Sequence, residues 1–171
     1  AERFDLIAYH VAVDGLSLIF ILLTALLTFL MTLYGMSRGM ISPGRLFAVL
    51  LVAEAGLVGM LMTVNLVWFC VFSALELWAV FHLLRRWASS RAEIQALARF
   101  IQYQAFGWAL FAGGCVVLGW AYADAHAGYW SFDLFELVGA VPAGKFQTAA
   151  FYLLFYGLAV RTPLFPLHGW L

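Results

Sequence analysis

The sequence predicts an all-α membrane protein, a polytopic bundle of five transmembrane helices of which the last is broken. The first reason is composition: 65% of the 171 residues are hydrophobic and 11% are charged, whereas a soluble domain carries about 25% charged residues. The second is that five apolar stretches can cross about 30 Å of hydrocarbon, which takes roughly 20 helical residues. The third is that Pro163 and Pro166 interrupt the last stretch.

The expected spans form a single membrane domain, residues 1–171. They cover about residues 10–35, 44–63, 65–84, 97–122 and 147–171. Asp14 and Ser17 suit the start of the first helix, where free amides favour an acceptor and a negative charge. Asn65 marks a tight turn before the third span, and an aromatic-rich loop at 123–145 is expected partly in the headgroup zone. The chain has no initiator Met and stops inside an apolar run, so we expect a fragment of a longer protein.

Basic residues gather in the loops on one side of the predicted membrane. That side holds Arg38, Arg45, Arg85, Arg86, Arg91 and Arg99. The opposite side holds only Arg3 and Lys145, among Glu2, Asp5, Asp124, Asp133 and Glu136. Because basic loops stay cytoplasmic, the N-terminus is predicted to face outside.

The last span contains the most unusual pattern in the chain: Arg161, then the two prolines, then His168. Proline cannot donate the helical hydrogen bond and its ring clashes with the preceding turn. We therefore expect a break between Arg161 and Pro166, with His168 at or before a resumed helix. The break would leave carbonyls near 157–159 open to water or polar side chains. A charge at such a break is a candidate ion-pathway residue.

Three ionisable residues lie deep in the predicted spans: Glu54 and Glu76 near the middle of the second and third spans, and Arg161 at the break of the fifth. An isolated charge at that depth costs about 2.5–3.5 kcal/mol, so such residues usually face the bundle interior and pair. Two interpretations stay open. In the first, one carboxylate pairs with Arg161, the other is protonated, and the pair only holds helices together. In the second, the three residues form a relay for protons or other ions.

The sequence shows no phosphate-binding loop, metal-ligand spacing or nucleophile–base arrangement, so we expect no cofactor in this chain. Cys70 and Cys115 are far apart in sequence and are predicted to be packing residues that form no disulfide. The net charge of zero argues against a nucleic-acid partner.

Four segments, residues 13–18, 100–107, 128–133 and 163–171, resemble parts of the antiporter-like membrane subunits of respiratory complex I, the subunit M (chain 4) type in particular. Residues 13–18 resemble the opening of that family's third helix, 100–107 its sixth helix and 128–133 the following outer loop. Residues 163–171 match its seventh-helix signature, which is the most specific of these motifs. The resemblance implies that this chain holds about helices three to seven, which form half of an inverted-repeat fold.

The resemblance also implies proton carriers, a glutamate on the fifth helix and a lysine at the seventh-helix break. Here Ala74 takes the glutamate position, after Ser73 where tryptophan is usual, and Arg161 takes the lysine position. Glu76 lies two residues on, about 200° around the helix, so it is expected to contact an adjoining helix or subunit. Glu54 is then the expected partner of Arg161. The proton-pathway candidates are Glu54, Glu76, Arg161, His168 and Arg99, which replaces another family lysine.

The function implied is a proton-translocating, antiporter-like subunit of a complex I-like NADH (or other donor):quinone oxidoreductase, as a divergent paralogue without a catalytic centre of its own. Its partners would be other membrane subunits of such an assembly and the lipid bilayer, in an energy-transducing membrane such as the bacterial inner membrane. Two alternatives stay open: a non-conducting structural or docking subunit, and a membrane subunit of a CO2/bicarbonate-uptake complex.

Overall fold

The computed structural model describes residues 9–38, 43–138 and 144–170, without the side chains of Pro43, Trp87 and Lys145. Glu2, Arg3 and Asp5, used above to predict the orientation, lie outside the described residues, as does the side chain of Lys145. Regular structure in the described chain is helical. The helices are α1 (Gly15–Ser37), α2 (Pro43–Met62), α3 (Leu66–Trp87), α4 (Arg91–Ala125), α5 (Leu134–Leu137) and α6 (Lys145–Arg161).

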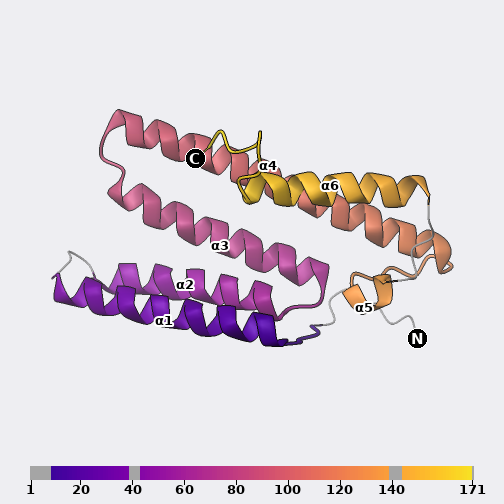
Figure 1. Cartoon of the computed structure of the whole chain (residues 1–171), viewed down its shortest axis with the longest axis horizontal. Coiled ribbons are helices and arrows are strands. Elements are labelled where there is room, and N and C mark those ends of the chain that lie inside the picture. The colour runs from indigo at the N-terminus through magenta and orange to yellow at the C-terminus, as the bar shows by residue number, and fades with distance from the viewer. Residues whose placement is uncertain (1–8, 39–42, 139–143, 171) are drawn as a thin grey trace.

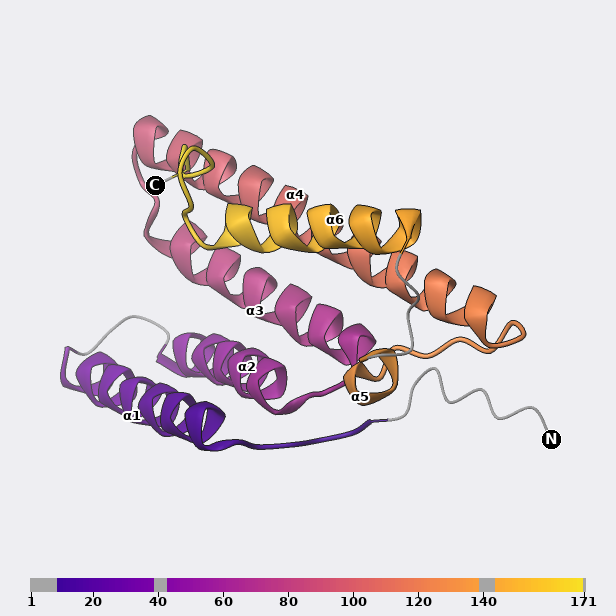
Figure 2. The same ribbon diagram turned by 45° about the vertical axis from the view of Figure 1, so that its right-hand side comes forward.

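Apart from the short α5, the helices run alternately back and forth along one axis (Figure 1). Neighbours in space follow the chain, because α1 contacts α2, α2 contacts α3, α3 contacts α4, and α4 contacts α6. Figure 2 shows the resulting order, with α3 between the α1–α2 pair and the α4–α6 pair.

Four helices of the described chain are long and apolar enough to cross a membrane: α1, α2 from Gly44, α3 as far as Arg86, and α4. With 35 residues, α4 is longer than the roughly 20 residues that a bilayer requires. The shorter α6 has 17 residues. The prediction of an all-α, polytopic membrane fold is confirmed.

Side chains cap the starts of α1, α3 and α4, whereas α6 starts after Gly144 without a side-chain cap. Asp14 accepts a hydrogen bond of 2.6 Å from the Ser17 amide, and hydrogen bonds from Ser17 hold the pKa of Asp14 below its ordinary value. Asn65 caps α3 through the Val67 amide at 2.9 Å. At the start of α4, Ser90 and Glu93 form a reciprocal capping box. This box explains why α4 starts at Arg91, earlier than the span expected from about residue 97.

Glycines set how closely the helices approach. A Cβ added at Gly157 on α6 would lie 2.6 Å from the backbone nitrogen of Phe111 on α4. One added at Gly114 on α4 would lie 2.7 Å from the Leu154 side chain. Only residues without a side chain allow the two backbones this close. On the other side of α3, Gly56 of α2 packs directly against Glu76.

The two ends of the bundle differ in charge. Arg38, Arg45, Arg85, Arg86 and Arg91 lie where α1 and α3 end and α2 and α4 begin (Figure 1). Asp124, Asp133 and Glu136 lie at the opposite end, hereafter the acidic end. There the His10 ring pairs with the buried Asp133 carboxylate. Which end faces the cytoplasm stays a prediction.

Backbone hydrogen bonds join three chain segments at the acidic end. The Ala12 amide donates to Met62 O at 2.9 Å, and the Val64 amide donates to His10 O at 3.1 Å. The Leu66 amide donates to Phe132 O at 2.9 Å. Backbone hydrogen bonds therefore link the α2–α3 turn both to the segment before α1 and to the segment before α5.

Candidate ion-pathway site

The site forms where α6 ends. Arg161 is its last residue, and Thr162 has extended backbone angles (φ −91°, ψ 115°), the region to which a following proline restricts a residue. The expected break at the prolines is confirmed, since the helix ends there. Within the described residues that follow, 162–170, the chain forms turns and no resumed helix. A cation in the last helical turn is favoured by the negative end of the helix dipole.

The carbonyls at the break are not open, contrary to the prediction. Leu158 O accepts from both the amide and the hydroxyl of Thr162, each at 2.8 Å. Ala159 O accepts from the Leu164 amide at 3.3 Å, and Val160 O accepts from the indole of Trp170 at 2.9 Å. The turns after the helix fold back over its end and supply these donors, so no water is needed there.

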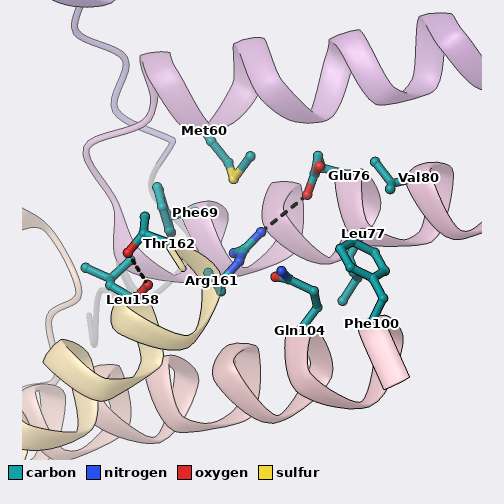
Figure 3. A pocket seen from close by; sticks show the side chains of 10 residues that line it. All are labelled: Met60, Phe69, Glu76, Leu77, Val80, Phe100, Gln104, Leu158, Arg161 and Thr162. Atoms are coloured by element: carbon teal, nitrogen blue, oxygen red, sulfur yellow. Dashed lines mark hydrogen bonds and ion pairs between the residues drawn. The ribbon is translucent and has the colours of Figure 1, made fainter. Parts of the chain in front are cut away.

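Arg161 pairs with Glu76 of α3. One guanidinium nitrogen (Nη2) lies 3.3 Å from Glu76 Oε2, and the other (Nη1) donates to Ser73 Oγ. Figure 3 shows the guanidinium reaching from the end of α6 towards the Glu76 carboxylate. The side chains of Arg161 and Glu76 are 16% and 19% exposed, so water screens the pair only in part.

The expectation that Glu54 is the partner of Arg161 is therefore wrong. Gly56 of α2 faces Glu76, and Glu54 lies about 200° around α2 from Gly56. Glu54 also lies two turns from Phe47, which contacts Gly35 of α1. The carboxylate is thus on the α1-facing side of α2, away from Arg161. Its role as a proton-pathway candidate stays a prediction.

A partly open cavity of about 340 Å³ adjoins the pair. Four helices or their ends contribute to it, so it lies at the junction of α2, α3, α4 and α6 (Figure 3). Its polar lining residues are Glu76, Arg161, Thr162 and the buried Gln104; its apolar lining residues are Met60, Phe69, Leu77, Val80, Phe100 and Leu158.

The other two candidates lie elsewhere. Arg99 is exposed on α4, and His168 is exposed with its ring 5.6 Å from that of Phe165. Neither lines the cavity. The structure thus brings together two of the five predicted residues, Glu76 and Arg161.

Sequence reasoning missed three polar contributors to this region: Ser73, Gln104 and Trp170. For Ser73 a signal existed, because it lies three residues before Glu76 and therefore on the same face of the helix. The Trp170 hydrogen bond depends on the path of the turn and has no local signal.

The two cysteines, distant in sequence, are neighbours in space. Cys70 and Cys115 are free thiols whose side chains interact with each other across α3 and α4. The surrounding contacts agree: Trp108 Nε1 donates to Cys70 O at 3.0 Å, and the rings of Phe69 and Phe111 are 5.2 Å apart.

Comparison with known proteins identifies the family. Residues 63–171, which include α3, α4 and α6, match the family model described as "NADH:quinone oxidoreductase/Mrp antiporter, TM". NAD(P)H-quinone oxidoreductase chain 4 of Gloeobacter violaceus is 34% identical over 166 residues, covering 95% of this chain and 30% of that protein.

Two further relatives cover a similar share of this chain. F(420)H(2) dehydrogenase subunit M of Methanosarcina mazei is 26% identical over 167 residues, which cover 95% of this chain and 33% of that protein. NADH-quinone oxidoreductase subunit M of Escherichia coli is 28% identical over 171 residues, which cover 96% of this chain and 33% of that protein. The chain spans about a third of the length of these relatives. Because the family match covers more than half of the sequence, this chain belongs to the NADH:quinone oxidoreductase/Mrp antiporter family of transmembrane proteins.

Proposed function

We propose that this chain is part of an antiporter-like subunit that moves protons across an energy-transducing membrane, within a complex that passes electrons from NADH or another donor to quinone. The names of the relatives support the kind of complex. The observation that carries the proton-translocating role is the Arg161–Glu76 pair at the end of α6, beside a partly open cavity at the junction of four helices.

In this proposal Glu76 is the group that gains and loses a proton. A carboxyl exchanges protons readily, whereas a guanidinium stays protonated in proteins. Arg161 therefore supplies a fixed positive charge that favours the ionised carboxylate. When a proton neutralises Glu76, the attraction across the 3.3 Å contact is lost, and Arg161 then favours release of that proton. The cavity has room for the water that would carry protons to and from the carboxylate.

The rest of the assembly follows from the same proposal. Other membrane subunits would adjoin this one, and redox cofactors would lie on other chains. The arginine-rich end would face the cytoplasm. Ala74 and Arg161 stand where the complex I resemblance implies glutamate and lysine, so we propose a divergent paralogue whose pair uses Glu76 instead.

Glu76→Gln tests the role in the assembled complex, reconstituted into liposomes. The measured quantity is the number of protons moved per electron pair passed to quinone. We expect a lower ratio than in the parent, with assembly and electron transfer retained. The matched control is Glu136→Gln, which changes an exposed glutamate of α5 and should leave the ratio unchanged. An unchanged ratio for Glu76→Gln in an intact complex would refute the proposal.

A second candidate function, a non-conducting structural subunit, is favoured by one observation. Arg161 cannot lose its proton and is bound on two sides, by Ser73 and Glu76, so the pair could serve only to join α6 to α3. In that case Glu76→Gln should leave the proton ratio of the surviving complex unchanged, even though the loss of the pair lowers its thermal stability.

A further inference from the structure

We propose that Ser73 is a positioning residue of this site: its hydroxyl fixes one nitrogen of the Arg161 guanidinium so that the other faces Glu76. The consequence for transport rests on the proposed function above, whereas the contact itself does not.

The geometry places both acceptors on one helix face. Ser73 and Glu76 are three residues apart on α3, so they lie one turn from each other. Arg161 Nη1 donates to Ser73 Oγ, and Nη2 donates to Glu76 Oε2 at 3.3 Å. The guanidinium is planar, with donors in a rigid fork. Two acceptors that take different nitrogens therefore fix its plane as well as its position.

The burial of Ser73 makes its hydroxyl hard to replace. Ser73 has no exposed surface and is among the largest fully buried side chains of the described chain. Water therefore cannot reach this position to accept the Nη1 hydrogen in its place. Burying such a donor without an acceptor is costly, so removal of the hydroxyl should drive the guanidinium to another position.

The cavity provides space for the guanidinium to adopt another position. Arg161 lines the cavity of about 340 Å³, and a long arginine side chain has many accessible rotamers. Hydrogen bonds at Thr162 and Leu164 hold the backbone at the end of α6, but they do not act on the guanidinium. Glu76 alone is a single contact to one nitrogen. Ser73 is thus the second point that keeps the cation against the carboxylate.

Two substitutions separate the hydroxyl from the volume it fills. Ser73→Ala removes both the acceptor and some volume, whereas Ser73→Cys keeps a side chain of similar size with only a weak acceptor. If the hydroxyl is what matters, the two variants should behave alike. A residue that only fills space would show its effect in Ser73→Ala and lose it in Ser73→Cys.

A double-mutant cycle on thermal stability tests the contact independently of transport. Ser73→Ala is made in the parent complex and in an Arg161→Met background, which removes the guanidinium and keeps an unbranched side chain. We expect a lower thermal midpoint in the parent and no further change in the Arg161→Met background. The control is Thr24→Ala on α1, whose hydroxyl bonds to Phe20 O; its effect should be the same in both backgrounds. Equal effects of Ser73→Ala in the two backgrounds would overturn the inference.

Transport measurements then test the positioning role. Ser73→Ala and Ser73→Cys should both lower the proton ratio and change the pH profile of pumping, and neither should do so in the Arg161→Met background. If Glu76→Gln abolishes pumping but Ser73→Ala leaves ratio and pH profile as in the parent, Ser73 does not position the cation for transport. If the stability cycle shows coupling but Glu76→Gln has no effect on pumping, the Ser73–Arg161 contact is supported and the proposed function fails.

Discussion

The indole of Trp170 donates to the carbonyl oxygen of Val160 at 2.9 Å, which closes the turn after α6 back onto the helix. The Trp170 ring also meets the Phe100 ring of α4 edge to face, with centroids 5.3 Å apart. Phe100 lines the cavity beside Arg161. The turn is therefore attached at once to the end of α6 and to the wall of the candidate site.

Trp170→Phe should separate these two contacts. Phenylalanine keeps an aromatic ring against Phe100 but has no donor for Val160 O, so we expect a loss of about 1 kcal/mol in stability. Thermal unfolding of the purified complex measures it. Trp120→Phe is the control, because that indole is 56% exposed and its ring contact with Phe146 would remain. Equal stability of the two variants would show that the hydrogen bond adds nothing.

The close packing of α4 and α6 predicts opposite results for two adjacent glycines. Gly114→Ala places a Cβ 2.7 Å from the Leu154 side chain and 3.0 Å from its backbone nitrogen. Overpacking of this kind costs about 1–3 kcal/mol. Gly113→Ala meets nothing within 4 Å and should be neutral or stabilising by up to about 1 kcal/mol, because alanine favours helix. The same loss at both positions, measured by thermal unfolding, would contradict the close contact.

Replacement of Glu76 and replacement of Glu54 should lower the free energy of unfolding by different amounts. Glu76→Gln leaves the Arg161 cation without its carboxylate, and breaking a buried pair costs about 3–5 kcal/mol. We expect about 3 kcal/mol, because both side chains are partly exposed. Glu54→Gln leaves the Arg161–Glu76 pair intact and should cost less. A larger loss for Glu54→Gln in the same thermal assay would return Glu54 to the role of partner.

Cysteine labelling tests the predicted orientation. In a background with Cys70 and Cys115 replaced by alanine, a cysteine introduced by Ser89→Cys should resist an impermeant reagent added outside. One introduced by Ala127→Cys should react, because residue 127 lies beyond α4, at the acidic end. Both positions are exposed, so access depends on the side of the membrane. Reversed labelling would overturn the argument from the arginine distribution.

Cys70 and Cys115 are predicted to remain free in the isolated protein, although their side chains interact. Both lie within apolar helices, where the water-soluble oxidants that form disulfides have little access. Digestion without reductant followed by mass spectrometry should find both thiols unmodified. A linked pair of peptides would contradict the prediction.

Local signals in the sequence account for most of the fold. The end of α6 follows from Pro163, the start of α3 from Asn65, and the start of α4 could have been predicted from the serine and glutamate three residues apart at Ser90 and Glu93. Each depends on backbone chemistry within one turn of the residue concerned. Boundaries of this kind can be inferred without knowing what the helix packs against.

The candidate site was predicted only in part, because it depends on how helices rotate about their own axes. The presence of Glu76 and Arg161 in apolar spans was evident, but their pairing requires the face of α3 that carries Ser73 and Glu76 to meet the end of α6. The expectation of Glu54 as the partner follows from the offset of Glu76, about 200° around the helix from Ala74, and that offset does not determine which face of α3 meets Arg161. The contact of Gly56 with Glu76 turns Glu54 the other way. The interaction between Cys70 and Cys115 was missed for the same reason.

The backbone hydrogen bonds at the acidic end hold that end of the bundle together in a way that the arginine-rich end does not share within the described residues. They tie the segment before α1 and the α2–α3 turn to the segment before α5. At the arginine-rich end, no backbone bond between the α1–α2 pair and the α3–α4 pair is present in the described residues, which omit 39–42. Within the described residues, the backbone hydrogen bonds that hold the α1–α2 pair to the rest of the bundle are thus confined to the acidic end. If the α1–α2 pair tilts, displacement is smallest at the acidic end and grows along α2, past the contact of Gly56 with Glu76, towards the arginines.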